Sequence, residues 1–171
     1  TTIYLIEDYK DIDKLEVNSS EIAYVTQTTL SVDETKGLIE ALKIKYPQII
    51  GPSADDICYA TQNRQDAVKQ LSLECEIVLV IGSKTSSNSN RLKELAEKCG
   101  TKSFLIDDKS DIDIEELKHT SSVGITAGAS APEEIVQEVI SFLYPLGYKT
   151  VRNLSENNES MTFKLPKELA D

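Results

Sequence analysis

The alternation of short apolar runs with amphipathic helical patterns constrains the fold of this chain more than any other sequence feature. Each apolar run has the length of a single strand, and many of its residues are β-branched, which favours buried strands. The runs are residues 3–6, 22–26, 77–81, 103–106 and 123–126. A repeated strand–helix–strand order predicts parallel strands with helices on both faces of the sheet. The sequence therefore predicts an α/β fold.

The intervening segments predict the helices that cover this sheet. Each carries apolar residues at the three- and four-residue spacing of an amphipathic helix. These segments are residues 32–45, 59–73, 90–98, 112–117 and 132–143. Pro47, Gly51 and Pro52 interrupt the chain between the first two helices. We therefore expect residues 1–52 to belong to one α/β unit, residues 53–145 to form a second, and residues 146–171 to form a tail.

Charge and composition exclude several classes of function. The 171 residues include 18 Lys and Arg against 29 Asp and Glu, a formal net charge of −11, whereas nucleic-acid binding needs a basic face. No apolar run approaches the roughly 20 residues that span a bilayer, and no signal-peptide pattern opens the chain. Three widely spaced cysteines indicate a reducing compartment. We expect a cytoplasmic protein without nucleic-acid or membrane partners. Because the chain begins with Thr1 inside a strand-like pattern, we also expect it to be part of something longer.

Cys58 is the first candidate functional residue. It precedes the helical pattern of residues 59–73, and the positive end of a helix dipole favours the thiolate, which binds metals and attacks substrates. The alternative is a half-buried cysteine that only packs. A thiol nucleophile is disfavoured, because His119 is the only histidine and lies outside this motif. With Cys75 and Cys99 expected to pack or to lie near the surface, the chain alone cannot complete a zinc or iron–sulfur site.

Three loops share one design, in which an apolar strand is followed by small polar residues and then by a helix start. They are residues 25–31, 82–91 and 126–132. At the carboxyl ends of parallel strands, hydroxyl donors and the free amides of helix N-termini together form an anion site. The alternative for each loop is an ordinary capping or turn sequence. Lys84 and Arg91 flank the second loop and either contribute charge or are solvated.

Four motifs in this order resemble one family, the 4-hydroxy-3-methylbut-2-enyl diphosphate reductases (IspH/LytB). They read VTQTTLS at residues 25–31, DICYATQNRQ at 56–65, GSKTSSNSNRL at 82–92 and TAGASAP at 126–132. The ending LPKEL at residues 165–169 also resembles the tail of that family. The likeness extends over essentially the whole chain.

The resemblance implies a three-lobed α/β oxidoreductase of isoprene biosynthesis by the non-mevalonate pathway. A central [4Fe-4S] cluster is held by one cysteine from each lobe, and Cys58 matches one of these ligands. The substrate's diphosphate is held by the residues that match Ser86, Ser87, Asn88 and Ser130. Thr28 matches a catalytic threonine that orients the substrate hydroxyl and the proton relay. The enzyme removes that hydroxyl as water, yields isopentenyl and dimethylallyl diphosphates, and takes electrons from a redox partner such as ferredoxin or flavodoxin.

The chain departs from the family pattern in its length. It has no counterpart of the N-terminal lobe, which carries the other two cluster cysteines, the substrate-facing histidines and a glutamate proton donor. The resemblance therefore implies a C-terminal part, with residues 1–52 as the end of the second lobe, 53–145 as the third lobe and 146–171 as the C-terminal tail. We expect this part alone to hold neither an intact cluster nor activity. The alternative function is a phosphate- or phosphosugar-binding α/β module without catalysis.

Overall fold

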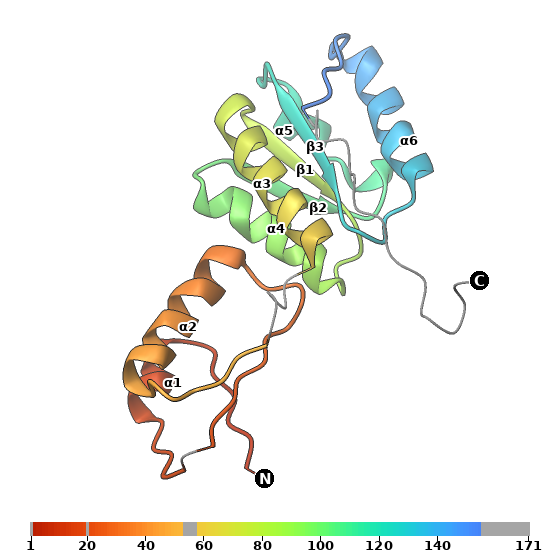
Figure 1. The fold of residues 1–171 in the computed structure, drawn as a ribbon. Coiled ribbons are helices and arrows are strands. Elements are labelled where there is room, and N and C mark those ends of the chain that lie inside the picture. The colour runs from red at the N-terminus through yellow and green to blue at the C-terminus, as the bar shows by residue number, and fades with distance from the viewer. Residues whose placement is uncertain (1, 20, 53–57, 155–171) are drawn as a thin grey trace, which may run out of the picture.

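A three-stranded parallel sheet organises the larger part of the molecule (Figure 1). The computed structural model describes residues 2–19, 21–52 and 58–154. The strands are β1 (Ile77–Ile81), β2 (Lys102–Ile106) and β3 (Val123–Ala127), in the order β2-β1-β3. Ile77 pairs with Lys102 on one side and with Val123 on the other. The central strand β1 is an uninterrupted apolar run and is buried throughout, as expected of a parallel strand covered on both faces.

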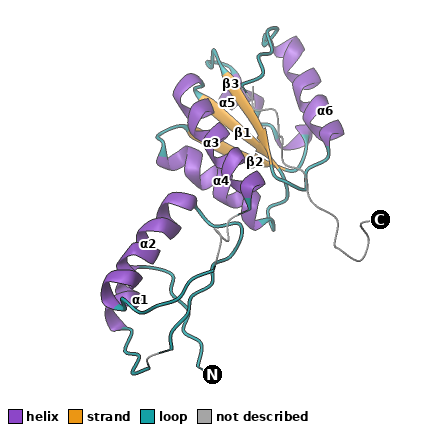
Figure 2. Ribbon diagram, in the orientation of Figure 1, coloured by secondary structure: helices purple, strands orange, loops and turns teal. Residues whose placement is uncertain are grey.

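Helices cover both faces of this sheet. One face packs against α3 (Tyr59–Glu74) and α4 (Ser87–Lys98), and the other packs against α5 (Ile114–Leu117) and α6 (Glu133–Leu143) (Figures 1 and 2). Alternate residues of β1 supply the two cores. Val78 and Val80 belong to the cluster with α3 and α4, whereas Leu79 and Ile81 belong to the cluster with α5 and α6. The predicted α/β fold, with helices on both faces of a parallel sheet, is confirmed.

Residues 2–52 form a smaller unit around two helices, α1 (Tyr9–Lys14) and α2 (Val32–Lys45). Its apolar cluster consists of Ile12, Leu15, Leu42 and Tyr46, joined by partly buried neighbours. The Tyr46 hydroxyl donates a hydrogen bond to the Leu15 carbonyl at 2.6 Å and accepts one from the Val17 amide at 3.2 Å. This tyrosine therefore ties the chain after α1 to the end of α2.

The two strands expected in this unit, at residues 3–6 and 22–26, are not present as strands. The second is reduced to one parallel bridge between Ala23 and Ile50, and the first pairs with nothing in the described part of the chain. Ile3 and Leu5 are 90% and 78% exposed. The sequence has the right residue types, but a strand forms only where a neighbouring backbone accepts and donates its hydrogen bonds.

Helix boundaries differ from the predicted ones where a capping side chain decides them. The helix predicted from residue 90 begins at Ser87, because the Ser86 side chain caps it by accepting a hydrogen bond from the Ser89 amide. The segment 112–117 shortens to α5 because Asp113 is its cap. The short helix α1 was not predicted at all. It begins with a capping box in which Asp8 and Asp11 accept hydrogen bonds from each other's backbone amides.

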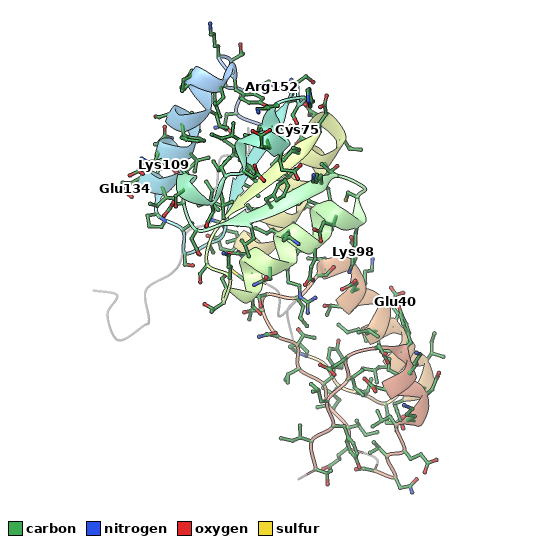
Figure 3. All side chains as sticks on the ribbon, turned by 180° about the vertical axis from the view of Figure 1, so that it is seen from behind. Glu40, Cys75, Lys98, Lys109, Glu134 and Arg152 are labelled. Carbon is green, nitrogen blue, oxygen red and sulfur yellow. The ribbon has the colours of Figure 1, made fainter. Side chains whose placement is uncertain are left out.

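Hydrogen bonds from Gln65 of α3 join the two units. Its side chain, 2% exposed, accepts a hydrogen bond from the Val32 amide at 3.0 Å and donates one to the Leu30 carbonyl at 2.8 Å. Exposed ion pairs add to this contact: Lys69 of α3 lies 2.8 Å from Asp33, and Lys98 pairs with Glu34. Figure 3 labels Lys98 at the end of α4. None of the helices in the described ranges is long and apolar enough to cross a membrane.

We expect Gln65→Ala to lower the free energy of unfolding by about 1–3 kcal/mol, since it leaves the half-buried Val32 amide and Leu30 carbonyl without these partners. Gln62→Ala, at an exposed position of the same helix, is the matched control and is expected to change stability by less than about 0.5 kcal/mol. Urea unfolding followed by circular dichroism measures both. Equal stability of the two variants would contradict the role assigned to Gln65.

Candidate functional site

The loops that follow β1 and β3 lie side by side at the carboxyl end of the sheet. The Gly128 amide donates a hydrogen bond to the Ile81 carbonyl at 2.8 Å, which continues the pairing of β1 with β3 beyond the last residues of the strands. On the other side, the Gly82 amide donates to the Ile106 carbonyl of β2 at 2.9 Å. Two of the three predicted anion-binding loops, 82–91 and 126–132, are thereby brought together, at the edge where open α/β sheets bind ligands.

Ser89 fills the space between these two loops. It is completely buried, and its Oγ would lie only 2.2 Å from a Cβ placed on Gly82 and 2.3 Å from a Cβ placed on Gly128. Any residue larger than glycine at either position therefore has to displace the serine. The two glycines are required by this close approach of a side chain.

The N-terminus of α4 presents several polar groups. Ser86 is its cap, and its Oγ accepts hydrogen bonds from the Ser89 amide at 3.3 Å and from Ser89 Oγ at 3.1 Å. Ser87 is the first helical residue and is exposed. Asn90 Nδ2 donates to the carbonyls of Lys84 and Ser86, at 2.8 and 2.9 Å, and so folds the loop back onto the helix start.

Asn88 is the most unusual side chain of the site. It is 7% exposed, and neither its Nδ2 nor its Oδ1 has a hydrogen-bond partner in the part of the chain that the structure describes. A buried polar atom without a partner costs about 1–3 kcal/mol. Native proteins keep very few such groups without a reason. The amide is therefore suited to hydrogen-bond with a group that lies outside the described residues.

Ser130 lies in the second loop of the pair, in the turn between β3 and α6, and is exposed. The turn is closed by a hydrogen bond from the Ala131 amide to the Gly128 carbonyl at 3.0 Å. Pro132 then caps α6 and uses no side-chain hydrogen bond. The amides in the first turn of α6 accordingly have no side-chain cap, a feature that α4 does not share.

Cys58 and Thr28 come together through their backbones. The Cys58 amide donates a hydrogen bond to the Thr28 carbonyl at 3.2 Å. Cys58 is the N-cap of α3, its carbonyl accepts from the Thr61 and Gln62 amides, and its exposed thiol makes no capping hydrogen bond. Because α3 runs antiparallel to the strands it covers, this end of the helix lies at the same edge of the sheet as the two loops.

Arg64 connects the start of α3 to the end of β3, a contact that was not predicted. Its Nε donates a hydrogen bond to the Ala127 carbonyl at 3.2 Å, and its Nη1 donates to the Ala60 carbonyl at 3.0 Å. The guanidinium thus fixes the cysteine-bearing turn against the strand that leads into the second loop. Nothing in a single sequence distinguishes such an arginine from the other charged residues of an amphipathic helix.

The other two cysteines and the histidine lie away from this edge. Cys75 precedes β1 at the opposite end of the sheet, where Figure 3 shows it near Arg152, and burial raises the pKa of its thiol above the ordinary value. Cys99 precedes β2, and His119 precedes β3, so both lie at that same far end. Arg91 is engaged by Glu94 at 2.7 Å. Within the described ranges, no three His, Cys, Asp or Glu side chains gather as metal ligands.

The fold and this edge define an α/β protein with polar side chains gathered at the carboxyl end of a parallel sheet. The family model described as LytB protein matches residues 1–144, and the chain belongs to that family. It is 55% identical over 168 residues to the 4-hydroxy-3-methylbut-2-enyl diphosphate reductase of Saccharophagus degradans, covering 98% of this chain and 54% of the relative. It is 56% identical over 170 residues to the enzyme of the same name from Chromohalobacter salexigens, covering 99% of this chain and 54% of the relative.

A solved structure agrees with these relatives. The E-1-hydroxy-2-methyl-but-2-enyl-4-diphosphate reductase from Plasmodium falciparum superposes with a TM-score of 0.86 at 34% sequence identity. The match covers 96% of this chain and 53% of that one. The chain therefore spans about half the length of the curated relatives and of the solved structure that it matches.

We expect Gly128→Ala to destabilise the protein by about 1–3 kcal/mol, because the new methyl group overpacks the space held by Ser89. Ser89→Ala should relieve this cost, since the next contacts of that methyl group, 3.5 Å to Ser89 Cβ and 3.7 Å to the Ile81 carbonyl, are ordinary ones. Gly82→Ala is the matched control. Its methyl group would still lie 2.9 Å from Ser89 Cβ, so Ser89→Ala should not rescue it. Thermal unfolding of the single and double variants tests the packing, and rescue of both glycine variants or of neither would contradict it.

Proposed function

We propose that this chain supplies the diphosphate-binding loops of a 4-hydroxy-3-methylbut-2-enyl diphosphate reductase, an oxidoreductase of isoprene biosynthesis. The buried, unpartnered amide of Asn88 carries this proposal, and the names of the relatives support it. In the proposed complex, Ser86, Ser87, Asn88 and Ser130 donate hydrogen bonds to the diphosphate oxygens. Their loops are adjacent, and the first-turn amides of α4 and α6 add backbone donors of the kind that bind anions.

The charge of the protein explains why the donors are neutral. A chain with a net charge of −11 repels an anion at long range, so binding has to rely on short-range dipoles. Hydrogen bonds to a charged acceptor contribute about 1.5–3 kcal/mol each, and hydroxyl and amide donors supply them without a charged side chain.

We also propose that residues 1–52 are the end of the second lobe of the complete enzyme, residues 53–145 the third lobe, and residues 146–171 the C-terminal tail. The apolar clusters support this division, since that of residues 6–49 shares no member with the two clusters of the sheet. Tyr148 and Leu154 pack against the sheet clusters, so the described start of the tail lies on the proposed third lobe. Residues 155–171 lie outside the described residues.

Cys58 is proposed as one ligand of a [4Fe-4S] cluster. Its residue type and setting fit the role, because the thiol is exposed at a helix start and no capping hydrogen bond engages it. Since no group of three His, Cys, Asp or Glu side chains gathers as metal ligands in the described ranges, the remaining ligands are proposed to come from the rest of the complete protein. When bound, such a cluster supplies electrons and a Lewis-acidic iron. The electron donor is proposed to be a ferredoxin or flavodoxin, and the compartment the cytoplasm.

The residues of this chain then bind and orient the substrate. The paired loops hold the diphosphate end, while the turn containing Thr28 lies beside Cys58. We assign to Thr28 Oγ1 a hydrogen bond to the substrate hydroxyl, through which that hydroxyl is positioned and a proton is relayed to it as it leaves as water. Arg64 holds the two parts of the site at a fixed separation by bonding to the end of β3 and the start of α3.

Titration of pyrophosphate into the isotope-labelled chain, followed by NMR, tests the diphosphate site. We expect binding with a Kd of about 1 mM, corresponding to about −4 kcal/mol, with amide shifts concentrated at residues 82–90 and 127–131. The shifts should vanish in Ser86→Ala/Asn88→Ala and persist in Ser141→Ala, an exposed serine on α6. Shifts centred on residues 149–152 would instead indicate charge attraction and contradict the site.

Anaerobic reconstitution of the full-length protein, followed by absorption and EPR spectroscopy, tests the ligand assignment. The full-length protein is expected to hold a [4Fe-4S] cluster, and the Cys58→Ser variant and the isolated chain are expected not to. Cys99→Ser, also an exposed cysteine, should retain the cluster. A stable cluster in Cys58→Ser would contradict the assignment, and diphosphate binding by a full-length protein without a cluster would favour a non-catalytic phosphate- or phosphosugar-binding module.

A further inference from the structure

Ser89 does not face the solvent, yet it contacts Ser86 and a glycine from each of the two loops of the proposed diphosphate site. It is completely buried, its Oγ donates a hydrogen bond to Ser86 Oγ at 3.1 Å, and it lies between Gly82 and Gly128. We propose that Ser89 is a positioning residue for diphosphate binding, which acts by orienting the hydroxyl of Ser86. This role rests on the proposed function.

The hydrogen-bond count at Ser86 supports this role. A serine hydroxyl has two lone pairs and one proton. Ser89 fills both lone pairs of Ser86 Oγ, one through its amide and one through its hydroxyl. The proton of Ser86 therefore has to point away from Ser89. Since Ser86 is only half-buried, that direction is open to a ligand, and the hydroxyl is fixed as a donor before an anion arrives.

The two glycines hold Ser89 in this position. Each directs a Cα–H bond at Ser89 Oγ, because a Cβ in place of that hydrogen would lie 2.2 Å from the oxygen at Gly82 and 2.3 Å from it at Gly128. Contacts of this type are weakly favourable. They also leave little free space around the oxygen, so the hydroxyl has little freedom to turn away from Ser86. A donor that is ordered in advance loses less entropy when it binds.

A double-mutant cycle on pyrophosphate affinity tests the proposal in the isotope-labelled chain. If Ser89 acts through Ser86, Ser89→Ala alone should weaken pyrophosphate binding about three- to tenfold, the equivalent of one hydrogen bond. In the background of Ser86→Ala, the same substitution should change affinity by less than about twofold, because the hydroxyl it orients is already gone. Ser103→Ala is the control. Ser103 is equally a buried serine with one hydroxyl hydrogen bond, to the Val78 carbonyl at 3.1 Å, but it lies within β2.

The outcomes separate this proposal from the function on which it rests. Equal losses from Ser89→Ala in both backgrounds would show that the serine only packs, and would overturn the positioning role while leaving the diphosphate site intact. Unchanged affinity in Ser89→Ala would overturn it as well. An unchanged chain that shows no shifts with pyrophosphate would overturn the diphosphate site and the role of Ser89 together. Should Ser89→Ala fold poorly, Ser89→Gly also removes the hydroxyl without adding volume, and the same cycle is expected to show a loss of the same sign.

Discussion

The hydrogen bond between the Gly128 amide and the Ile81 carbonyl is the interaction on which the site depends. It holds together two loops that are about 40 residues apart in sequence. With Ser89 packed between them, no room is left for a side chain at Gly82 or Gly128. Ser89 packs against both glycines of these loops. Arg64 fixes the start of α3 against the end of β3, and Gln65 joins the smaller unit of residues 2–52 to the same helix. The polar groups proposed to bind the diphosphate are therefore positioned by backbone contacts of the sheet together with the side chains of Ser89, Arg64 and Gln65.

The sequence was sufficient to predict the sheet and the edge at which the site lies. β1 and α2 have the predicted bounds, since an uninterrupted apolar run and a clear amphipathic stripe leave few alternatives. The parallel direction of the strands places their carboxyl ends and the following helix N-termini at one edge, so residues as distant as Ser86 and Ser130 were expected side by side. The strand at residues 3–6 was wrongly predicted, because residue type does not reveal whether a hydrogen-bonding neighbour exists.

Tertiary detail within the site was not predictable in the same way. Ser89 is one of four serines in the stretch from Ser83 to Ser89, and nothing in that run marks it as the buried one. Arg64 and Gln65 are polar residues on an amphipathic helix, yet they turn inward to bond with carbonyls contributed by distant segments. Such roles depend on which backbone groups the fold leaves unpaired, and this is known only once the chain has folded.

The exposed apolar residues of the smaller unit have a practical consequence for handling the chain. Ile3, Leu5, Val25 and Ile50 are each more than half exposed, and the only pairing near them in the described residues is the single bridge between Ala23 and Ile50. Extended apolar segments with unpaired backbone groups are templates for edge-to-edge association. At the concentrations used for spectroscopy, self-association of the isolated chain is accordingly expected to begin at these exposed segments. Ile3→Lys and Leu5→Lys are the substitutions best placed to suppress it.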